Sequence, residues 1–126
     1  IAQHRLGIRV SEIVMASNNV YYSGGRPIGH SFVQIPVRYV NELDVDLNNE
    51  DEAYALVNRR IFELASSAEL SFKVVPAEDN VTAFLQVENE TPIIYIEEIL
   101  YGSQKEGIAR CKFYFLPEDY DINFRL

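Results

Sequence analysis

Cysteine, basic residues and long apolar runs are all scarce in this sequence. Its one cysteine, Cys111, cannot form an internal disulfide, which favours a reducing, cytoplasmic compartment. No apolar run approaches the roughly 18 residues that a membrane-spanning helix requires, and the first residues lack a signal-peptide pattern. The sequence therefore predicts a cytoplasmic chain with no membrane partner.

Acidic residues outnumber basic ones by 19 to 11, which gives a formal net charge of −8. Binding to nucleic acid requires a basic face that neutralises phosphates, so these residues are not expected to contact DNA themselves. The sequence contains no P-loop, no GxGxxG, no HExxH and no CxxC motif. We therefore expect no cofactor and no metal ion.

The 126 residues, of which 48% are hydrophobic, suit one domain that can bury a core without disulfides. Two hairpins are predicted within it, because runs of β-branched and aromatic residues are joined by short glycine-containing loops. The first hairpin spans residues 10–22 and 28–35, and the second spans 93–101 and 108–116. Each ends at a proline, so the two halves form a weak internal repeat that predicts one sheet built from two hairpins.

Alternation along the first hairpin places polar side chains together. Asn19 and Tyr21 fall on one face of the first strand, and Ser31 falls with Gly29 on one face of the return strand. His30, on the other face of the return strand, is interpreted as a partly exposed sheet histidine rather than a catalytic one, because no Ser-His-Asp constellation is placed near it.

A helix is predicted from about residue 49 to about residue 65. Asn48 or Asn49 caps it, and the acidic residues that follow suit its positive N-terminal end. The opening of this segment resembles a calcium-binding loop, but Asn49 stands where that loop needs glycine and Ala55 where it needs glutamate. Further along, Arg59 and Glu63 are spaced as a solvent-exposed ion pair.

The remaining elements are a short helical turn over 2–8, a strand over 70–75 and a short helix over 81–87. Their order predicts an α+β fold, an antiparallel sheet made of two long hairpins with helices packed on one face. A ligand pocket is expected between the sheet and the helices.

Several motifs together resemble a known family. The motifs are Ala2-x-x-x-Leu6-Gly7, Gly25-Arg26-Pro27, Ile35-Pro36, Ala83-x-Leu85-x-Val87, Pro92 followed by Ile93-Ile94-Tyr95-Ile96-Glu97-Glu98, Phe113-Tyr114-Phe115 and Glu118-Asp119-Tyr120. This pattern resembles the UTRA domain, the effector-binding domain of HutC-type GntR-family transcription regulators, and the resemblance covers nearly the whole chain.

The resemblance implies a chorismate lyase-like fold that binds a small-molecule effector and forms a homodimer. Residues 1–126 would be one UTRA-like domain of a transcription regulator. Residue 1 is Ile rather than Met, which indicates a fragment of a longer chain. The winged helix-turn-helix that contacts DNA in this family is expected upstream and is absent from these residues.

Comparison with the family's pattern also suggests where the effector binds. An Arg-x-Arg pair of many members falls on Asn19 and Tyr21, and a common glutamate falls on Ser31, so the expected ligand is less anionic or more apolar than a phosphosugar. The ligand-binding residues predicted in this way are Asn19, Tyr21, Ser31, Ser71, Ala109 and Cys111.

Two other functions remain open from the sequence, a chorismate lyase-like enzyme and a ligand-free interaction module. The lyase carries a glutamate shortly before its final Leu-Pro, whereas here no acid lies between Lys112 and Phe115, just before Leu116-Pro117. The first strand also lacks arginine. Since acid-base chemistry needs such groups, a non-enzymatic role is expected.

Overall fold

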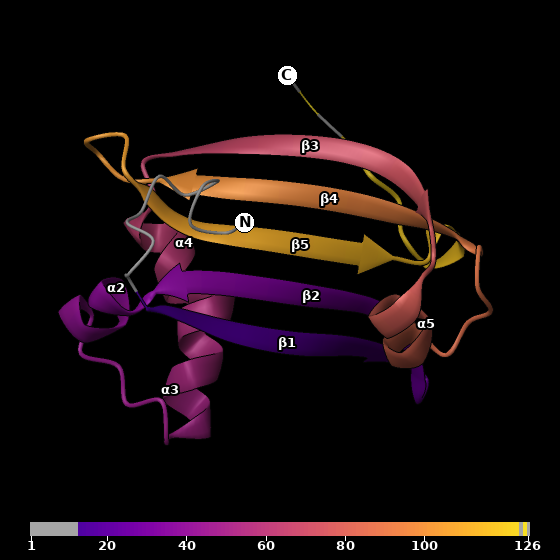
Figure 1. Cartoon of the computed structure of the whole chain (residues 1–126), viewed down its shortest axis with the longest axis horizontal. Coiled ribbons are helices and arrows are strands. Elements are labelled where there is room, and N and C mark those ends of the chain that lie inside the picture. The colour runs from indigo at the N-terminus through magenta and orange to yellow at the C-terminus, as the bar shows by residue number, and fades with distance from the viewer. Residues whose placement is uncertain (1–12, 124, 126) are drawn as a thin grey trace.

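The structure, a computed structural model, describes residues 13–123 and 125. Five strands form one antiparallel sheet in the order β1-β2-β5-β4-β3 (Figure 1). Their bounds are β1 Val14–Ser23, β2 Arg26–Pro36, β3 Ser67–Pro76, β4 Pro92–Tyr101 and β5 Gly107–Phe115. The α+β prediction is confirmed, whereas the helical turn predicted over 2–8 lies outside the described residues.

Pairing of the two hairpins builds the centre of the sheet. β1 pairs with β2, β4 pairs with β5, and the hairpins join through β2 and β5. The predicted construction from two hairpins is therefore confirmed. Gly24 and Gly25 form the first turn with φ angles of 57° and 77°, a left-handed conformation that glycine adopts without strain. β3 adds an outer strand beside β4 and is longer than predicted.

Cross-strand partners share a face, so the register divides the sheet into two surfaces. One surface, the Asn19 face, is defined by the row Asn19, Ser31, Phe113, Ile96 and Phe72 across the strands. The other surface, the His30 face, contains His30 and the neighbouring row Asn18, Phe32, Lys112, Glu97 and Ser71.

A continuous helical segment packs on the Asn19 face. It consists of α3 (Glu50–Ala55), a π-helical turn η1 (Leu56–Arg60) and α4 (Ile61–Leu64). Its start is as predicted, because the Asn49 side chain accepts hydrogen bonds from the backbone of Asp51 and Glu52. The exposed Arg59–Glu63 pair is also confirmed, at 3.2 Å.

The larger core lies between this segment and the sheet. Leu56 and Ile61 are fully buried against Ile35 and the neighbouring strand residues. A short helix that the sequence analysis missed, α2 (Val37–Glu42), follows β2 directly and adds Tyr39 and Val40 to the same core. Pro36 has the extended conformation of a residue that precedes a helix, so the proline ends the strand and starts α2.

The position of the short helix α5 corrects one part of the prediction. α5 (Asp79–Leu85) packs on the His30 face, where a second core contains Leu85, Ile93 and Leu116. Helices therefore cover both faces rather than one, because the apolar end of the His30 face also requires a cover. Figure 1 shows α5 and the α3–α4 segment at opposite ends of the sheet. Among the described residues, no helix is long and apolar enough to cross a membrane.

Candidate functional site

Three of the predicted ligand-binding residues meet on the Asn19 face. Asn19 on β1 donates through Nδ2 to Ser31 Oγ at 3.3 Å, and the Tyr21 hydroxyl lies 2.9 Å from the same oxygen. Ser31 is fully buried beneath the two β1 side chains, which are themselves partly exposed. The result is a small polar cluster at the β1–β2 end of the Asn19 face.

Aromatic rings border this cluster on one side. An added Cβ at Gly29, the partner of Tyr21, would lie 2.7 Å from Phe115 Cδ1 and 2.9 Å from the Tyr120 hydroxyl. Glycine at this position therefore allows the Phe115 and Tyr120 side chains to pack closely against the backbone of β2. Burial raises the pKa of Tyr120, with smaller contributions from Tyr21 and Asp119, so its hydroxyl keeps its proton at neutral pH.

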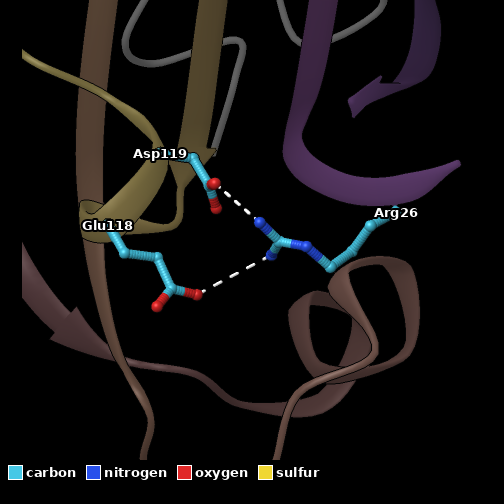
Figure 2. A network of polar contacts seen from close by, with 3 residues as sticks. All are labelled: Arg26, Glu118 and Asp119. Atoms are coloured by element: carbon cyan, nitrogen blue, oxygen red, sulfur yellow. Dashed lines mark hydrogen bonds and ion pairs between the residues drawn. The ribbon is translucent and has the colours of Figure 1, made fainter. Parts of the chain in front are cut away.

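Ion pairs hold the segment that carries Tyr120. Arg26, at the start of β2, donates to Asp119 Oδ1 at 2.6 Å and lies 3.7 Å from Glu118 Oε1 (Figure 2). Both acids belong to the 3₁₀ turn η2 (Pro117–Asp119). Because the guanidinium binds both carboxylates, the C-terminal turn is fixed beside the first hairpin and Tyr120 is positioned next to Tyr21.

A cavity of about 580 Å³ opens beside the cluster, between β1 and α3. This volume is within the range of about 300–1,000 Å³ that small-molecule sites occupy. Ser17 and Asn19 line it from the strand, and Glu50, Tyr54 and Val57 line it from the helical segment. Among the described lining residues Glu50 is the one charged side chain, so the cavity offers hydrogen bonds and apolar contact but no cation for a phosphate.

The other three predicted site residues lie elsewhere. Ala109 and Cys111 are on the Asn19 face but are fully buried in the core with the helical segment. Burial, with a smaller contribution from Glu98, raises the pKa of the Cys111 thiol to about 12, so it is a neutral core group. Ser71 lies on the His30 face, beside a different hollow that it shares with Tyr95.

Several residues of the site were not predicted. Tyr54 and Glu50 come from the predicted helix, but the sequence does not tell which turn of that helix lies over β1. Tyr120 belongs to the Glu118-Asp119-Tyr120 motif, which could have indicated it. Its approach to Tyr21 depends on Gly29 and on the Arg26 ion pairs, both of which are tertiary features.

Solved structures share this fold. YydK of Bacillus subtilis, described as a transcriptional regulator, superimposes with a TM-score of 0.78 at 19% identity, and the match covers 98% of this chain and 55% of that chain. A ligand-binding domain ascribed to a GntR-family regulator of Bordetella bronchiseptica superimposes with a TM-score of 0.78 at 16% identity. The match covers 98% of this chain and 79% of that chain. The C-terminal domain of a histidine utilization repressor from Pseudomonas syringae superimposes with a TM-score of 0.78 at 14% identity. The match covers 98% of this chain and 86% of that chain.

The fold is therefore that of the C-terminal domains of GntR-family transcriptional regulators. The UTRA domain model matches residues 2–121, and the chain belongs to the UTRA domain family. The resemblance seen in the sequence motifs is thus confirmed. No curated protein matches the chain significantly. The family and the fold support a ligand-binding regulatory domain, and nothing in these matches favours the lyase alternative.

Proposed function

We propose that this chain is the effector-binding and dimerisation domain of a cytoplasmic, bacterial GntR-family transcription regulator. The observation that carries the proposal is the Asn19–Ser31–Tyr21 cluster at the edge of a 580 Å³ cavity on a UTRA fold. The chain spans only 55% of the length of YydK. A DNA-binding winged helix-turn-helix preceding residue 1 belongs to the proposal.

Asn19, Tyr21 and Ser31 are the residues that contact the effector in this proposal. An amide both donates and accepts, and the two hydroxyls do either, so the cluster suits ligand hydroxyl, carbonyl or amine groups. Glu50 adds negative charge at the opposite wall. A neutral or cationic effector with an apolar part fits this lining better than a phosphorylated sugar does.

A thermal-shift screen tests the proposal. The panel contains amines, amino sugars and polyols, each beside a phosphorylated or carboxylated compound of similar size. Any compound that binds the native state must raise the melting temperature by mass action. We expect hits among the neutral and cationic members. Hits confined to the phosphorylated members would contradict the proposed ligand class, and a complete lack of hits would favour a ligand-free interaction module.

Assembly gives a first prediction, a homodimer in solution. On the outer strand β3, Leu70, Phe72 and Val74 all project from the Asn19 face, and Phe72 and Val74 are 44% and 73% exposed. Contiguous exposed apolar side chains of this kind are typical of association surfaces, and most homo-oligomers are two-fold dimers. Light scattering at tens of micromolar should give twice the monomer mass, and a monomer mass would refute the prediction.

DNA binding gives a second prediction. With a net charge of −8, the isolated chain should not shift a DNA duplex at low micromolar concentration, because it has too few cations to displace phosphate counterions. The full-length regulator should bind its operator. A salt-sensitive, sub-micromolar gel shift with the isolated chain would show that this domain contacts DNA directly.

A binding role rather than an enzymatic one is part of the proposal. The cavity lining contains one acid, Glu50, and no basic residue among its described members, so it lacks a paired acid and base. Incubation with chorismate, followed by detection of pyruvate, should give no product above the buffer rate. Turnover that Glu50→Gln abolishes would instead support the enzyme alternative.

A further inference from the structure

The outer strand β3 leaves one edge of the sheet open. It pairs with β4 from Ser67 to Pro76, and no described strand lies on its other side. Every residue of β3 except Val75 is exposed. By contrast, α5 covers His30, which stacks on Phe84 at 4.2 Å and is only 3% exposed, not partly exposed as the sequence indicated. β3 is therefore the least covered strand of the sheet.

Few of the features that normally prevent an edge strand from pairing occur in β3. Natural sheets protect their edges with short strands, β-bulges or prolines. β3 has ten residues, its pairing with β4 shows no register shift, and its one proline, Pro76, is its last residue. The opposite edge strand, β1, has a register shift between Tyr21 and Tyr22. Backbone N–H and C=O groups of alternate β3 residues therefore point away from β4 and are available to another strand.

The side chains of β3 separate by charge between the two faces of the sheet. Leu70 and Val74 lie on the Asn19 face and are 48% and 73% exposed. Glu69 and Lys73 lie on the His30 face, one on each side of Ser71, and border the same hollow. Neither charged side chain forms an ion pair with another described residue. Opposite charges at equal distances from Ser71 make the strand complementary to a reversed copy of itself.

One antiparallel register places these charges opposite each other. A two-fold axis that is perpendicular to the sheet and passes beside Ser71 pairs this residue with itself. Glu69 then lies opposite Lys73 of the second copy, and symmetry repeats the pair. On the other face, Leu70 lies opposite Phe72 of the second copy. If the axis moves by one residue in either direction, the apolar row still pairs but Glu69 no longer lies opposite Lys73. Because cross-strand pairs of opposite charge are stabilising, the register centred on Ser71 is favoured.

We propose that two copies of this domain pair along β3 in this register, so that two five-stranded sheets become one continuous sheet. The proposal rests on the dimerisation that belongs to the proposed function, and it identifies the surface that performs it. The effector cavity is lined by β1, the strand at the opposite edge of the sheet. Both cavities therefore stay open, at the two ends of the joined sheet.

Charge reversal tests the proposed register. Glu69→Lys places like charges opposite each other in both pairs, as does Lys73→Glu, so each should weaken dimerisation at least about tenfold in analytical ultracentrifugation. The double variant Glu69→Lys/Lys73→Glu restores opposite charges and should dimerise like the unmodified chain. An equimolar mixture of the two single variants should form a heterodimer. Glu42→Lys on α2 and Arg59→Glu on η1 are matched controls at exposed positions and should have no effect.

A cross-link measures the same register independently. Ser71→Cys places two thiols beside the axis, where the Cα atoms of opposed residues lie roughly 4.5–5.5 Å apart, within the range of a disulfide. Mild oxidation should give a covalent dimer, and Cys111 should not interfere because it is buried. Ser67→Cys is the control. Four residues from the axis, it would lie roughly 26 Å from its symmetry mate and should remain a monomer on a denaturing gel.

Three outcomes would overturn the proposal: dimerisation that the single reversals leave unchanged, a folded double reversal that stays monomeric, or equal cross-linking of Ser71→Cys and Ser67→Cys. The effector-site variant Asn19→Ala/Tyr21→Phe, measured in the same series, should dimerise normally. A monomeric unmodified chain would refute the dimerisation part of the proposed function together with this interface. A dimer that is insensitive to the β3 variants would refute the interface alone.

Discussion

Glu97→Ala should lower the free energy of unfolding by about 3–5 kcal/mol, which is the usual cost of leaving one member of a buried ion pair uncompensated. Arg110 Nη2 donates to Glu97 Oε2 at 2.8 Å, and the two side chains are only 6% and 11% exposed. The Tyr95 hydroxyl donates to the same carboxylate oxygen at 3.0 Å. Removal of the carboxylate leaves a guanidinium buried in the sheet without its counter-charge.

Urea unfolding of three variants measures this effect. The matched control is Glu63→Ala, which breaks an ion pair whose side chains are about 60% exposed and should cost at most about 0.5 kcal/mol. Glu97→Leu combined with Arg110→Met removes both charges and should recover most of the loss, since an apolar pair of similar volume is often neutral. If Glu97→Ala and Glu63→Ala lower the free energy of unfolding equally, burial does not make the Glu97–Arg110 pair more important for stability than an exposed pair.

Asn19→Ala combined with Tyr21→Phe should weaken effector binding about tenfold or more, because each neutral hydrogen bond contributes about 0.5–1.5 kcal/mol. The two substitutions remove the two groups that surround Ser31 Oγ and keep the strand apolar enough to fold. Calorimetric titration with a compound from the thermal-shift screen gives the affinity.

Tyr22→Phe is the control for this variant, because Tyr22 is the next residue on β1 and is 63% exposed, whereas the hydrogen bonds to Ser31 Oγ come from Asn19 and Tyr21. Its affinity should equal that of the unmodified chain. Circular dichroism and the melting temperature without ligand check that the double variant folds. If a folded double variant binds with unchanged affinity, Asn19 and Tyr21 do not contact the effector.

The parts of the fold that could be predicted from the sequence are those determined by residues close together in the chain. The hairpins follow from glycine turns and β-branched runs, and the long helix follows from its acidic first turn and the Asn49 cap. Alternation within one strand correctly placed Asn19 with Tyr21. Each of these inferences uses interactions between residues that are close in the sequence, where spacing and residue type determine the geometry.

The positions of other residues depend on the pairing of distant strands and on packing, which sequence spacing does not determine. Ser71 alternates correctly within β3, but the side of the sheet that it faces is set by its pairing with Glu97 on β4. The burial of His30 depends on Phe84 of α5, a helix whose position on the sheet has no local signal. The apolar character of Ala109 and Cys111 indicates equally a core or a pocket wall, and packing with α3–α4 places both in the core.

The position of the bound effector is the most direct test of the proposed function, and a crystal structure of the chain with a compound from the screen provides it. The account predicts that the compound occupies the cavity between β1 and α3, within hydrogen-bond distance of Asn19, Tyr21 or Ser31. A compound found beyond contact distance of all three residues, whether at the His30 face or elsewhere, would contradict it.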